Sequence, residues 1–306
     1  MHKVVYLMPT FVRSIFYLIS LMPRKVIQLL GSLVGVINYY LNTSAAQISR
    51  ENIELCRPNA LSDLVSEKVF LKQSLVQTGK TLMESPAIWF GDADEIDGWI
   101  ENVNNEAKLK FFLEDSAGLL LLLPHLGNWE LFNVFIKRYG QMSALYRPPR
   151  RGYLRKVMEK ARLKHGNKVV SPTKSGLKHL YKTLHLGGTV VVLPDQVPTS
   201  GGFAPFFGHQ AYTGLLASKL LKKTGSHVLG VAMVRNPLGL FDAHIVEPDP
   251  SIYELDEPTS LKAINHLMQI CVEIEPTQYQ WEYKRFKKRP LGARKLYRFD
   301  KPPALH

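Results

Sequence analysis

Apolar runs alternate with helical patterns in the second half of the chain, from about residue 117 onward. Short apolar runs predict strands at 118–123, 142–146, 188–193, 227–234 and 240–246. Between them, apolar positions at helical spacing predict helices at 128–139, 152–165, 174–185, 211–224 and 259–274. This alternation is typical of an α/β fold in which helices flank a central, mainly parallel sheet. The unbroken leucine run at 119–123 suits a strand that is buried on both faces.

The N-terminal segment has a different pattern. Residues 4–22 carry a single charge, Arg13, and residues 26–49 carry none. A helix that spans a bilayer needs about 20 apolar residues, and Pro9 and Pro23 break this segment into shorter pieces. Basic residues beside apolar helices favour anchoring at the membrane interface, with buried core helices as the alternative. We therefore expect an apolar helical membrane anchor over residues 1–49 and a catalytic domain over residues 50–306.

Composition and charge narrow the class of protein. Of 306 residues, 45% are hydrophobic. The net charge of +13 indicates an acidic partner such as nucleic acid, anionic lipid or an acidic carrier protein, with a basic protein that is simply soluble as the alternative. Nucleic-acid-binding motifs are not evident, so we expect no nucleic-acid partner. There is no His-Glu-x-x-His or Cys-x-x-Cys spacing, and we expect no metal site. The two cysteines, Cys56 and Cys271, fit a reducing compartment.

The turn that follows the leucine-rich strand holds the candidate chemistry. Ligands of parallel sheets bind beyond the carboxyl ends of the strands, which directs attention to the residues after Leu123 and Leu193. With His125 on the turn, Gly127 would permit the turn, Asn128 would cap the next helix, and Glu130 would lie in its first turn. From there Glu130 could hold one ring nitrogen, so that the other abstracts a proton from a hydroxyl. Ordinary helix capping and a structural histidine are the alternatives.

The spacing His-x4-Glu after a hydrophobic strand resembles the His-x4-Asp/Glu motif of glycerolipid and lysophospholipid acyltransferases. The whole chain resembles, more specifically, the lipid A late acyltransferase family of Gram-negative bacteria. The similar segments keep the family's order along most of the chain. They are 50–58, Tyr146-Arg147-Pro148, Ala161-Arg162-Leu163, Asn167-Lys168, 193–196, 201–203, 205–208, Thr213, Thr224-Gly225 and 281–290.

The resemblance implies residue roles. His125 would be the general base and Glu130 its orienting partner, and Arg147, Arg162 and Asp195 would support them. Arg147 could hold an acceptor phosphate through its bidentate guanidinium, and Arg162 the phosphate or the oxyanion. The alternatives are a solvated basic helix face, since residues 145–168 hold nine Lys/Arg, and an ordinary turn aspartate at 195.

The Gly/Pro-containing segment after Asp195 is the second block to which the resemblance assigns substrate binding. Gly202, Phe203 and Phe206, with Phe207, would line an acyl tunnel. A private core of the loop is an equal alternative for these aromatic residues. The part of the loop at 196–202 varies within the family, which leaves the acceptor open.

The resemblance also implies the partners and the location. An acyl-acyl carrier protein would be the donor co-substrate, with no bound cofactor. A lipid A precursor would be the acceptor, at the cytoplasmic side of the bacterial inner membrane. The net charge and eight Lys/Arg in 284–298 fit an acidic carrier protein or anionic membrane lipid.

Three other functions stay open at this stage. The first is acylation of another lipid, such as a lysophospholipid, an ornithine lipid or a glycolipid. The second is a non-enzymatic basic protein that binds membrane or nucleic acid. The third is a serine hydrolase, although the chain lacks the Gly-x-Ser-x-Gly elbow of that class.

Overall fold

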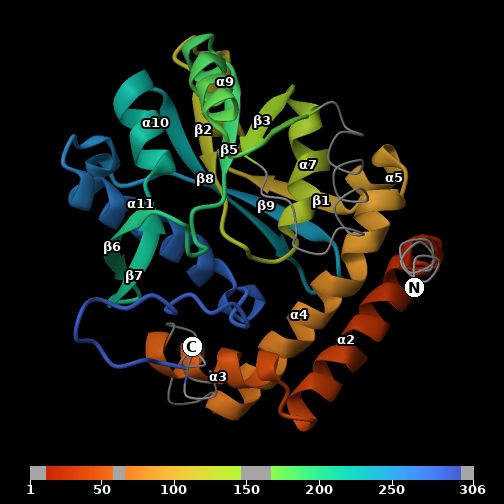
Figure 1. Ribbon diagram of the computed structural model, residues 1–306. Coiled ribbons are helices and arrows are strands. Elements are labelled where there is room, and N and C mark those ends of the chain that lie inside the picture. The colour runs from red at the N-terminus through yellow and green to blue at the C-terminus, as the bar shows by residue number, and fades with distance from the viewer. Residues whose placement is uncertain (1–11, 58–65, 146–166, 298–306) are drawn as a thin grey trace, which may run out of the picture.

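The computed structural model describes residues 12–57, 66–145 and 167–297 and shows an α/β fold built on a seven-stranded sheet (Figure 1). The strand order is β1-β9-β8-β2-β5-β3-β4. All neighbouring strands are parallel except β8 and β9. The strands are β1 (Ile100–Asn104), β2 (Leu119–Leu122), β3 (Met142–Leu145), β4 (Lys168–Val170), β5 (Thr189–Val192), β8 (His227–Arg235) and β9 (Phe241–Val246).

Helices cover both faces of the sheet, and β2 lies at its centre with every residue buried. Leu120 and Leu122 face the cluster formed with α9 (Lys174–His185), α10 (Leu216–Thr224) and α11 (Glu257–Ile274). Leu119 and Leu121 face the opposite cluster, to which α5 (Ala93–Asp97), α6 (Glu106–Glu114) and α7 (Phe132–Phe135) contribute. Successive side chains of a strand point to opposite faces, which is why a continuous leucine run is needed here.

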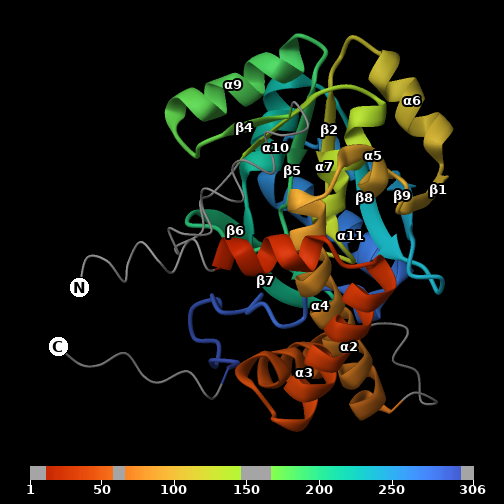
Figure 2. The same cartoon turned by 90° about the vertical axis from the view of Figure 1, so that its right-hand side faces the viewer.

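Three long helices lie at the lower edge of the sheet in both ribbon views (Figures 1 and 2). They are α2 (Arg24–Tyr40), α3 (Ser44–Cys56) and α4 (Glu67–Phe90), and residue 49 falls inside α3. The backbones of α2 and α4 approach closely at Gly31, Gly35 and Gly79, where a Cβ atom would meet backbone of the facing helix. Small residues at a helix crossing allow this close packing, so α2 is docked tightly onto the domain.

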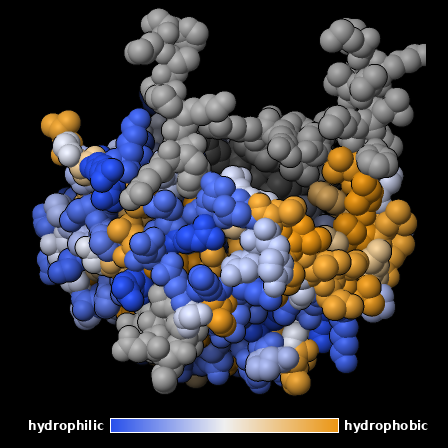
Figure 3. Space-filling view, turned by 90° about the horizontal axis from the view of Figure 1, so that it is seen from below, coloured by the Kyte–Doolittle hydropathy of each residue, from blue (hydrophilic) through white to orange (hydrophobic). Residues whose placement is uncertain are grey.

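The outer side of the N-terminal helices is apolar and exposed. A helix over residues 12–20 precedes α2, and large hydrophobic side chains on the two point outward. They include Tyr17, Leu18, Val26, Leu29, Leu33, Ile37 and Tyr40, and Leu21 in the turn between the two helices is exposed as well. Figure 3 shows a continuous hydrophobic area on the side where α2 lies. Within the described residues, the structure contains no helix with the length and hydropathy needed to cross a membrane.

A two-stranded antiparallel hairpin, β6 (Gly201–Phe206) and β7 (His209–Gly214), forms a separate small sheet. The guanidinium of Arg285 donates hydrogen bonds to the Tyr212 carbonyl at 2.7 Å and to Thr213 Oγ1 at 2.8 Å. Arg285 was expected to belong to an exposed basic tail. Instead it is buried beneath the hairpin, whereas Lys287 and Lys288 nearby are exposed.

Most of the predicted elements are confirmed, and the differences concern two of the predicted helices. All five predicted strands exist, and α9 and α11 match their predicted ranges closely. The predicted helix at 128–139 is a series of three short turns, η1 (Trp129–Leu131), α7 and η2 (Ile136–Arg138). The prediction of one helix over 211–224 is wrong at its start, because β7 occupies 209–214. The predicted helix at 152–165 lies outside the described residues.

Other elements were not predicted, because their residues show no clear periodic pattern of apolar positions. They are β1, α6, β4, the strand β6, and the 3-10 turns η3 (Pro250–Tyr253) and η4 (Pro276–Gln278). Cys56 and Cys271 are both buried free thiols. Burial raises the pKa of each thiol well above its usual range, so neither is a reactive thiolate.

Candidate active site

The chain turns sharply after β2, and the turn carries His125. Gly127 has φ +58°, and a Cβ atom at this position would collide with the carbonyl oxygen of Met233 on β8. The Gly127 amide donates to the Gln278 carbonyl at 3.1 Å, and the Asn128 amide donates to the Met233 carbonyl at 3.2 Å. Glycine is required at 127 both for the backbone conformation and for this close approach. The turn predicted around Gly127 is therefore confirmed.

Asp195 holds the imidazole of His125. Asp195 lies on the turn after β5, and its carboxylate is 2.7 Å from His125 Nδ1. Its second oxygen accepts a hydrogen bond from the His125 backbone amide at 2.8 Å. The Asp195 side chain is only 2% exposed, while that of His125 is 14% exposed. The buried carboxylate thus fixes both the ring and the backbone of a histidine that faces outward.

Contacts with His125 favour the ionised form of Asp195. Burial by itself raises the pKa of the Asp195 carboxyl. The electrostatic interaction and the two hydrogen bonds with His125 outweigh burial, so the pKa lies below its ordinary value. An ionised carboxylate can only accept hydrogen bonds, so Nδ1 carries the proton. The lone pair of Nε2 is then left as the proton acceptor.

A pocket of about 390 Å³ opens beside His125 at the carboxyl ends of β2, β3 and β5. Its walls are mainly apolar, as a hydrocarbon chain requires. The ring of Trp129 lies edge-on to the imidazole at a centroid distance of 4.8 Å. The apolar wall residues are Leu123, Phe132, Met142, Ala144, Leu145, Val169, Val191, Val192, Leu193, Pro194, Val197, Pro198 and Leu216.

Glu130 lines the same pocket as His125 and lies in the first turn after it, as the sequence predicted. Its side chain is 4% exposed. The carboxylate on Nδ1, however, belongs to Asp195, whereas the sequence pointed to Glu130 for that position. A direct bond from Glu130 to the imidazole stays a prediction. Asn128 begins the turn but does not cap it, because its side-chain amide donates to Glu84 at 3.1 Å instead.

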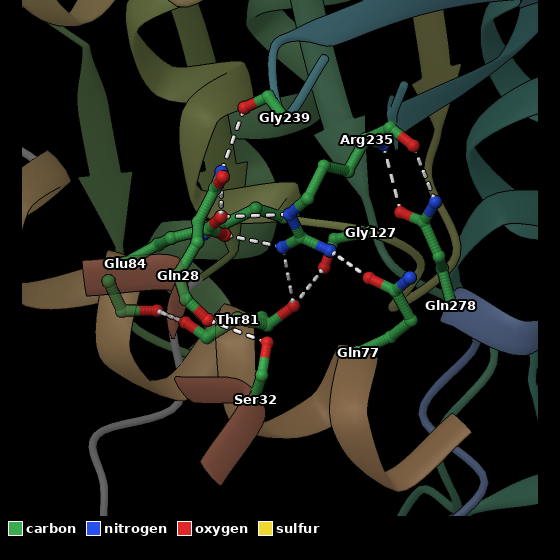
Figure 4. A network of polar contacts seen from close by, with 11 residues as sticks. Gln28, Ser32, Gln77, Thr81, Glu84, Gly127, Arg235, Gly239 and Gln278 are labelled. Carbon is green, nitrogen blue, oxygen red and sulfur yellow. Dashed lines mark hydrogen bonds and ion pairs between the residues drawn. The ribbon is translucent and has the colours of Figure 1, made fainter. Parts of the chain in front are cut away.

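Beneath the His125 turn lies a buried ion pair between Glu84 of α4 and Arg235 at the end of β8 (Figure 4). Arg235 Nε donates to Glu84 at 2.8 Å, and its terminal nitrogens contact Glu84 again, Gln77 at 2.6 Å and Thr81 at 3.2 Å. Thr81 in turn donates to the Gly127 carbonyl at 2.7 Å. The network therefore reaches Gly127 through Thr81 and Asn128 through Glu84.

The network was not foreseen from the sequence. A glutamate inside the apolar stretch Thr81–Phe90 and an arginine directly after the apolar run 227–234 were the available signals. Charged residues are almost never fully buried unless they are paired, so two such residues suggest a buried pair. Nothing in the linear pattern shows that they meet, because they are 151 positions apart.

The remaining predicted site residues fall into two groups. Arg147 and Arg162 lie outside the described residues. Gly202, Phe203, Phe206 and Phe207 are described, but the pocket beside His125 is lined by other residues. Phe206 and Phe207 instead pack in the core with Tyr279, Trp281 and Phe286, and Phe203 packs against Tyr212. The packing of Phe206 and Phe207 agrees with the alternative of a local core, and the lining of an acyl tunnel by these aromatic residues stays a prediction.

A mainly parallel sheet with a carboxylate-held imidazole beside an apolar pocket is compatible with an enzyme that transfers an acyl group. Comparison with known proteins identifies the group of enzymes. Residues 2–288 match the model of the bacterial lipid A biosynthesis acyltransferase family, and the chain belongs to that family.

Relatives from two organisms show how similar the chain is to named enzymes. It is 27% identical over 291 residues to the lipid A biosynthesis lauroyltransferase of Escherichia coli strain K12, covering 93% of this chain and 92% of that enzyme. It is 25% identical over 281 residues to the palmitoleoyltransferase of the same strain, covering 90% of both. A Haemophilus influenzae lipid A biosynthesis acyltransferase is 25% identical over 284 residues, covering 90% of this chain and 89% of the relative.

Proposed function

We propose that this acyltransferase moves a fatty acyl group from an acyl carrier protein thioester to a hydroxyl of a lipid A precursor, with His125 as general base. The observation that carries the proposal is the His125–Asp195 pair at the mouth of an apolar pocket, in a chain of this family. The acyl chain would lie in the pocket, and its thioester carbonyl would be next to Nε2.

The chemistry follows from the proton positions. Nε2 of His125 accepts the proton of the acceptor hydroxyl as its oxygen attacks the thioester carbon. The C–O bond forms, the C–S bond breaks, and the imidazolium returns the proton to the departing thiolate. Asp195 stabilises the imidazolium and keeps Nε2 pointed at the hydroxyl. No covalent enzyme intermediate is needed. The roles of Glu130, and of Arg147 and Arg162 at the acceptor phosphate or the oxyanion, are part of the proposal.

The exposed apolar side of α2 and of the helix before it supports attachment to a membrane. Leucine side chains along one side of a helix insert into the headgroup region, and basic residues remain at its surface. Residues 1–49 would then hold the protein on the cytoplasmic side of the inner membrane, and the catalytic domain would start near residue 50. An acidic carrier protein would be attracted by the net charge of +13.

The direct test is an assay of the purified full-length protein with acyl-acyl carrier protein and a tetra-acylated lipid A precursor. We expect transfer by the natural sequence and loss of transfer in His125→Gln, with unchanged circular dichroism and melting temperature. Full activity of that variant would disprove the mechanism. A serine-directed probe that labels the protein would favour a hydrolase. Loss of acyl chains from another lipid in a deletion strain, with lipid A unchanged, would assign a different acceptor.

A further inference from the structure

A second, more polar hollow lies on the other side of the His125 turn. Its volume is about 720 Å³, and it is enclosed by α2, α4, the β8–β9 turn and η4. The network in Figure 4 forms part of its wall, because Gln28, Gln77, Arg235 and Gln278 line it. None of these residues lines the pocket beside His125. The hollow is therefore distinct from the pocket to which we assign the acyl chain.

The hollow carries an excess of positive charge. Lys25 of α2 and Lys80 of α4 line the hollow, and so does Arg235 at the end of β8. Within the described part of the chain, neither lysine has a carboxylate within ion-pair distance, and Glu84 is occupied by Arg235. Glu275 is the acidic residue in the lining, and it accepts a hydrogen bond from Thr277 at 2.6 Å. Two unpaired lysines against one carboxylate leave a site that attracts an anion.

The surroundings of Lys80 also favour the binding of an anion. Lys80 is half-buried, and burial together with the nearby charge of Arg235 lowers the pKa of its ammonium group. A cation held in this position without a partner is unfavourable until an anion arrives. The side chains of Gln73, Gln77 and Ser32 add polar groups that can reach a phosphate or a glycerol hydroxyl.

The rim of the hollow is apolar. Leu29 of α2 and Leu238 of the β8–β9 turn line it and are 70% and 68% exposed. Leu33, one turn along α2 from Leu29, is also exposed, so the apolar rim continues along the outer side of α2. A cationic hollow that borders an exposed apolar face fits an amphiphile, with its headgroup in the hollow and its chains along the leucines.

We propose that this hollow binds the phosphate-bearing headgroup of an anionic lipid, with Lys25 and Lys80 as the phosphate ligands. The phosphate can belong to a membrane phospholipid or to the acceptor itself, and these two sources are chemically alike. Binding of a membrane phospholipid does not depend on the reaction at His125. Binding of the acceptor phosphate rests on the proposed function.

Three variants of the full-length protein test the site. Lys25→Gln with Lys80→Gln removes the two cations. Gln73→Trp fills the hollow without changing the charge, at an exposed position of α4. Lys68→Gln with Lys178→Gln is the charge-matched control, because both residues are exposed and lie outside the hollow. Melting temperatures show that each variant is folded.

The first measurement is binding to phosphatidylcholine vesicles with and without phosphatidylglycerol, expressed as the ratio of the two affinities. If a phospholipid occupies the hollow, the lysine variant loses about thirtyfold in this ratio, at roughly 1 kcal/mol for each of the two lysines. Gln73→Trp also lowers the ratio, and the control variant keeps it. A loss that depended on charge alone would affect the control equally and would overturn the proposal.

The second measurement is the KM for the lipid A precursor, with and without its phosphates, in neutral detergent micelles. If the acceptor phosphate occupies the hollow, both hollow variants raise the KM of the phosphorylated acceptor and leave that of the dephosphorylated form unchanged. Their vesicle ratio then stays at the natural value. An unchanged vesicle ratio together with an unchanged KM overturns the headgroup site. If the natural protein showed no acyl transfer, this would count against the proposed function alone, because vesicle binding needs no catalysis.

Discussion

His125 and Asp195 occupy equivalent positions on the turns that follow the neighbouring strands β2 and β5. Leu122 of β2 and Val192 of β5 are register partners in the parallel sheet. His125 lies three positions after Leu122, and Asp195 lies three positions after Val192. The two turns therefore emerge side by side, and the carboxylate reaches both Nδ1 and the backbone amide of His125. The sheet register thus sets the geometry of the pair, and the rigid β2–β5 ladder preorganises it.

The substitution Asp195→Asn tests whether this pair activates the imidazole. An amide cannot stabilise the imidazolium, and it can present its NH2 group to Nδ1, which favours the wrong tautomer. We expect kcat to fall about 10²-fold or more, with a smaller change in KM. Steady-state kinetics with acyl-acyl carrier protein measure both. A fall confined to KM would contradict the assignment.

The pH dependence of the same pair provides a second measurement. The pKa of the Asp195 carboxyl lies below its ordinary value, so the group stays ionised well into the acidic range. The loss of kcat/KM on the acid side therefore reports protonation of the imidazole, which can no longer accept a proton. The carboxylate also contributes stability that is fully present above its unfolded pKa and is lost as pH falls through the lower folded value.

The substitution Glu130→Gln separates a chemical role for Glu130 from a structural one. The amide keeps the shape of the side chain and removes its charge. If Glu130 assists the reaction, turnover falls about 10²-fold or more while the melting temperature stays close to the natural value. A drop of many degrees in melting temperature would show that the buried carboxylate is structural. Asp195→Asn in the same assay provides the scale for the comparison.

The sequence predicted the fold class and the position of His125 on the turn after the leucine-rich strand, and both predictions succeeded for a physical reason. Continuous apolar strands such as 119–123 can be recognised from the sequence, because a strand that is buried on both faces is apolar at every position. The turn at His125 and Gly127 was visible because it directly follows such a strand. The partner of His125 was not, because strand order decides which turns are adjacent. Asp195 is 70 residues away in sequence, and it becomes a neighbour through the β2–β5 pairing.

The two alternatives at the hairpin could not be separated from the sequence for the same reason. Aromatic residues in a loop rich in Gly and Pro can line a tunnel or a local core, and linear spacing does not distinguish them. Phe206 is buried because Arg285, from the C-terminal part of the chain, closes over the hairpin with its guanidinium 5.5 Å from the ring centroid. A basic residue in a run of basic residues gave no sign of that burial.

The Thr81 hydroxyl links the buried network to the His125 turn, and Thr81→Val removes that link with little change of shape. The Gly127 carbonyl then loses its 2.7 Å hydrogen bond, and the buried group left without a partner costs about 1–3 kcal/mol. We expect kcat to fall severalfold, with a modest decrease in melting temperature. Ser85→Ala is the control, because the Ser85 hydroxyl donates to the Thr81 carbonyl within α4 and does not contact the turn. Equal losses of kcat in the two variants would rule out a specific role for Thr81.

The ion pair between Glu84 and Arg235 allows positioning to be separated from stability. Arg235→Met leaves the Glu84 carboxylate buried without its cation, which should cost about 3–5 kcal/mol in the free energy of unfolding. In Glu84→Met with Arg235→Met both charges are removed, so most of that loss should be recovered. Urea unfolding of the single and double variants measures the coupling. Activity should not recover with stability, because Asn128 and Thr81 have still lost their partners in the network. A double variant that regained both stability and turnover would show that the pair contributes to folding alone, and one as unstable as the sum of the single variants would show that the two charges are not coupled.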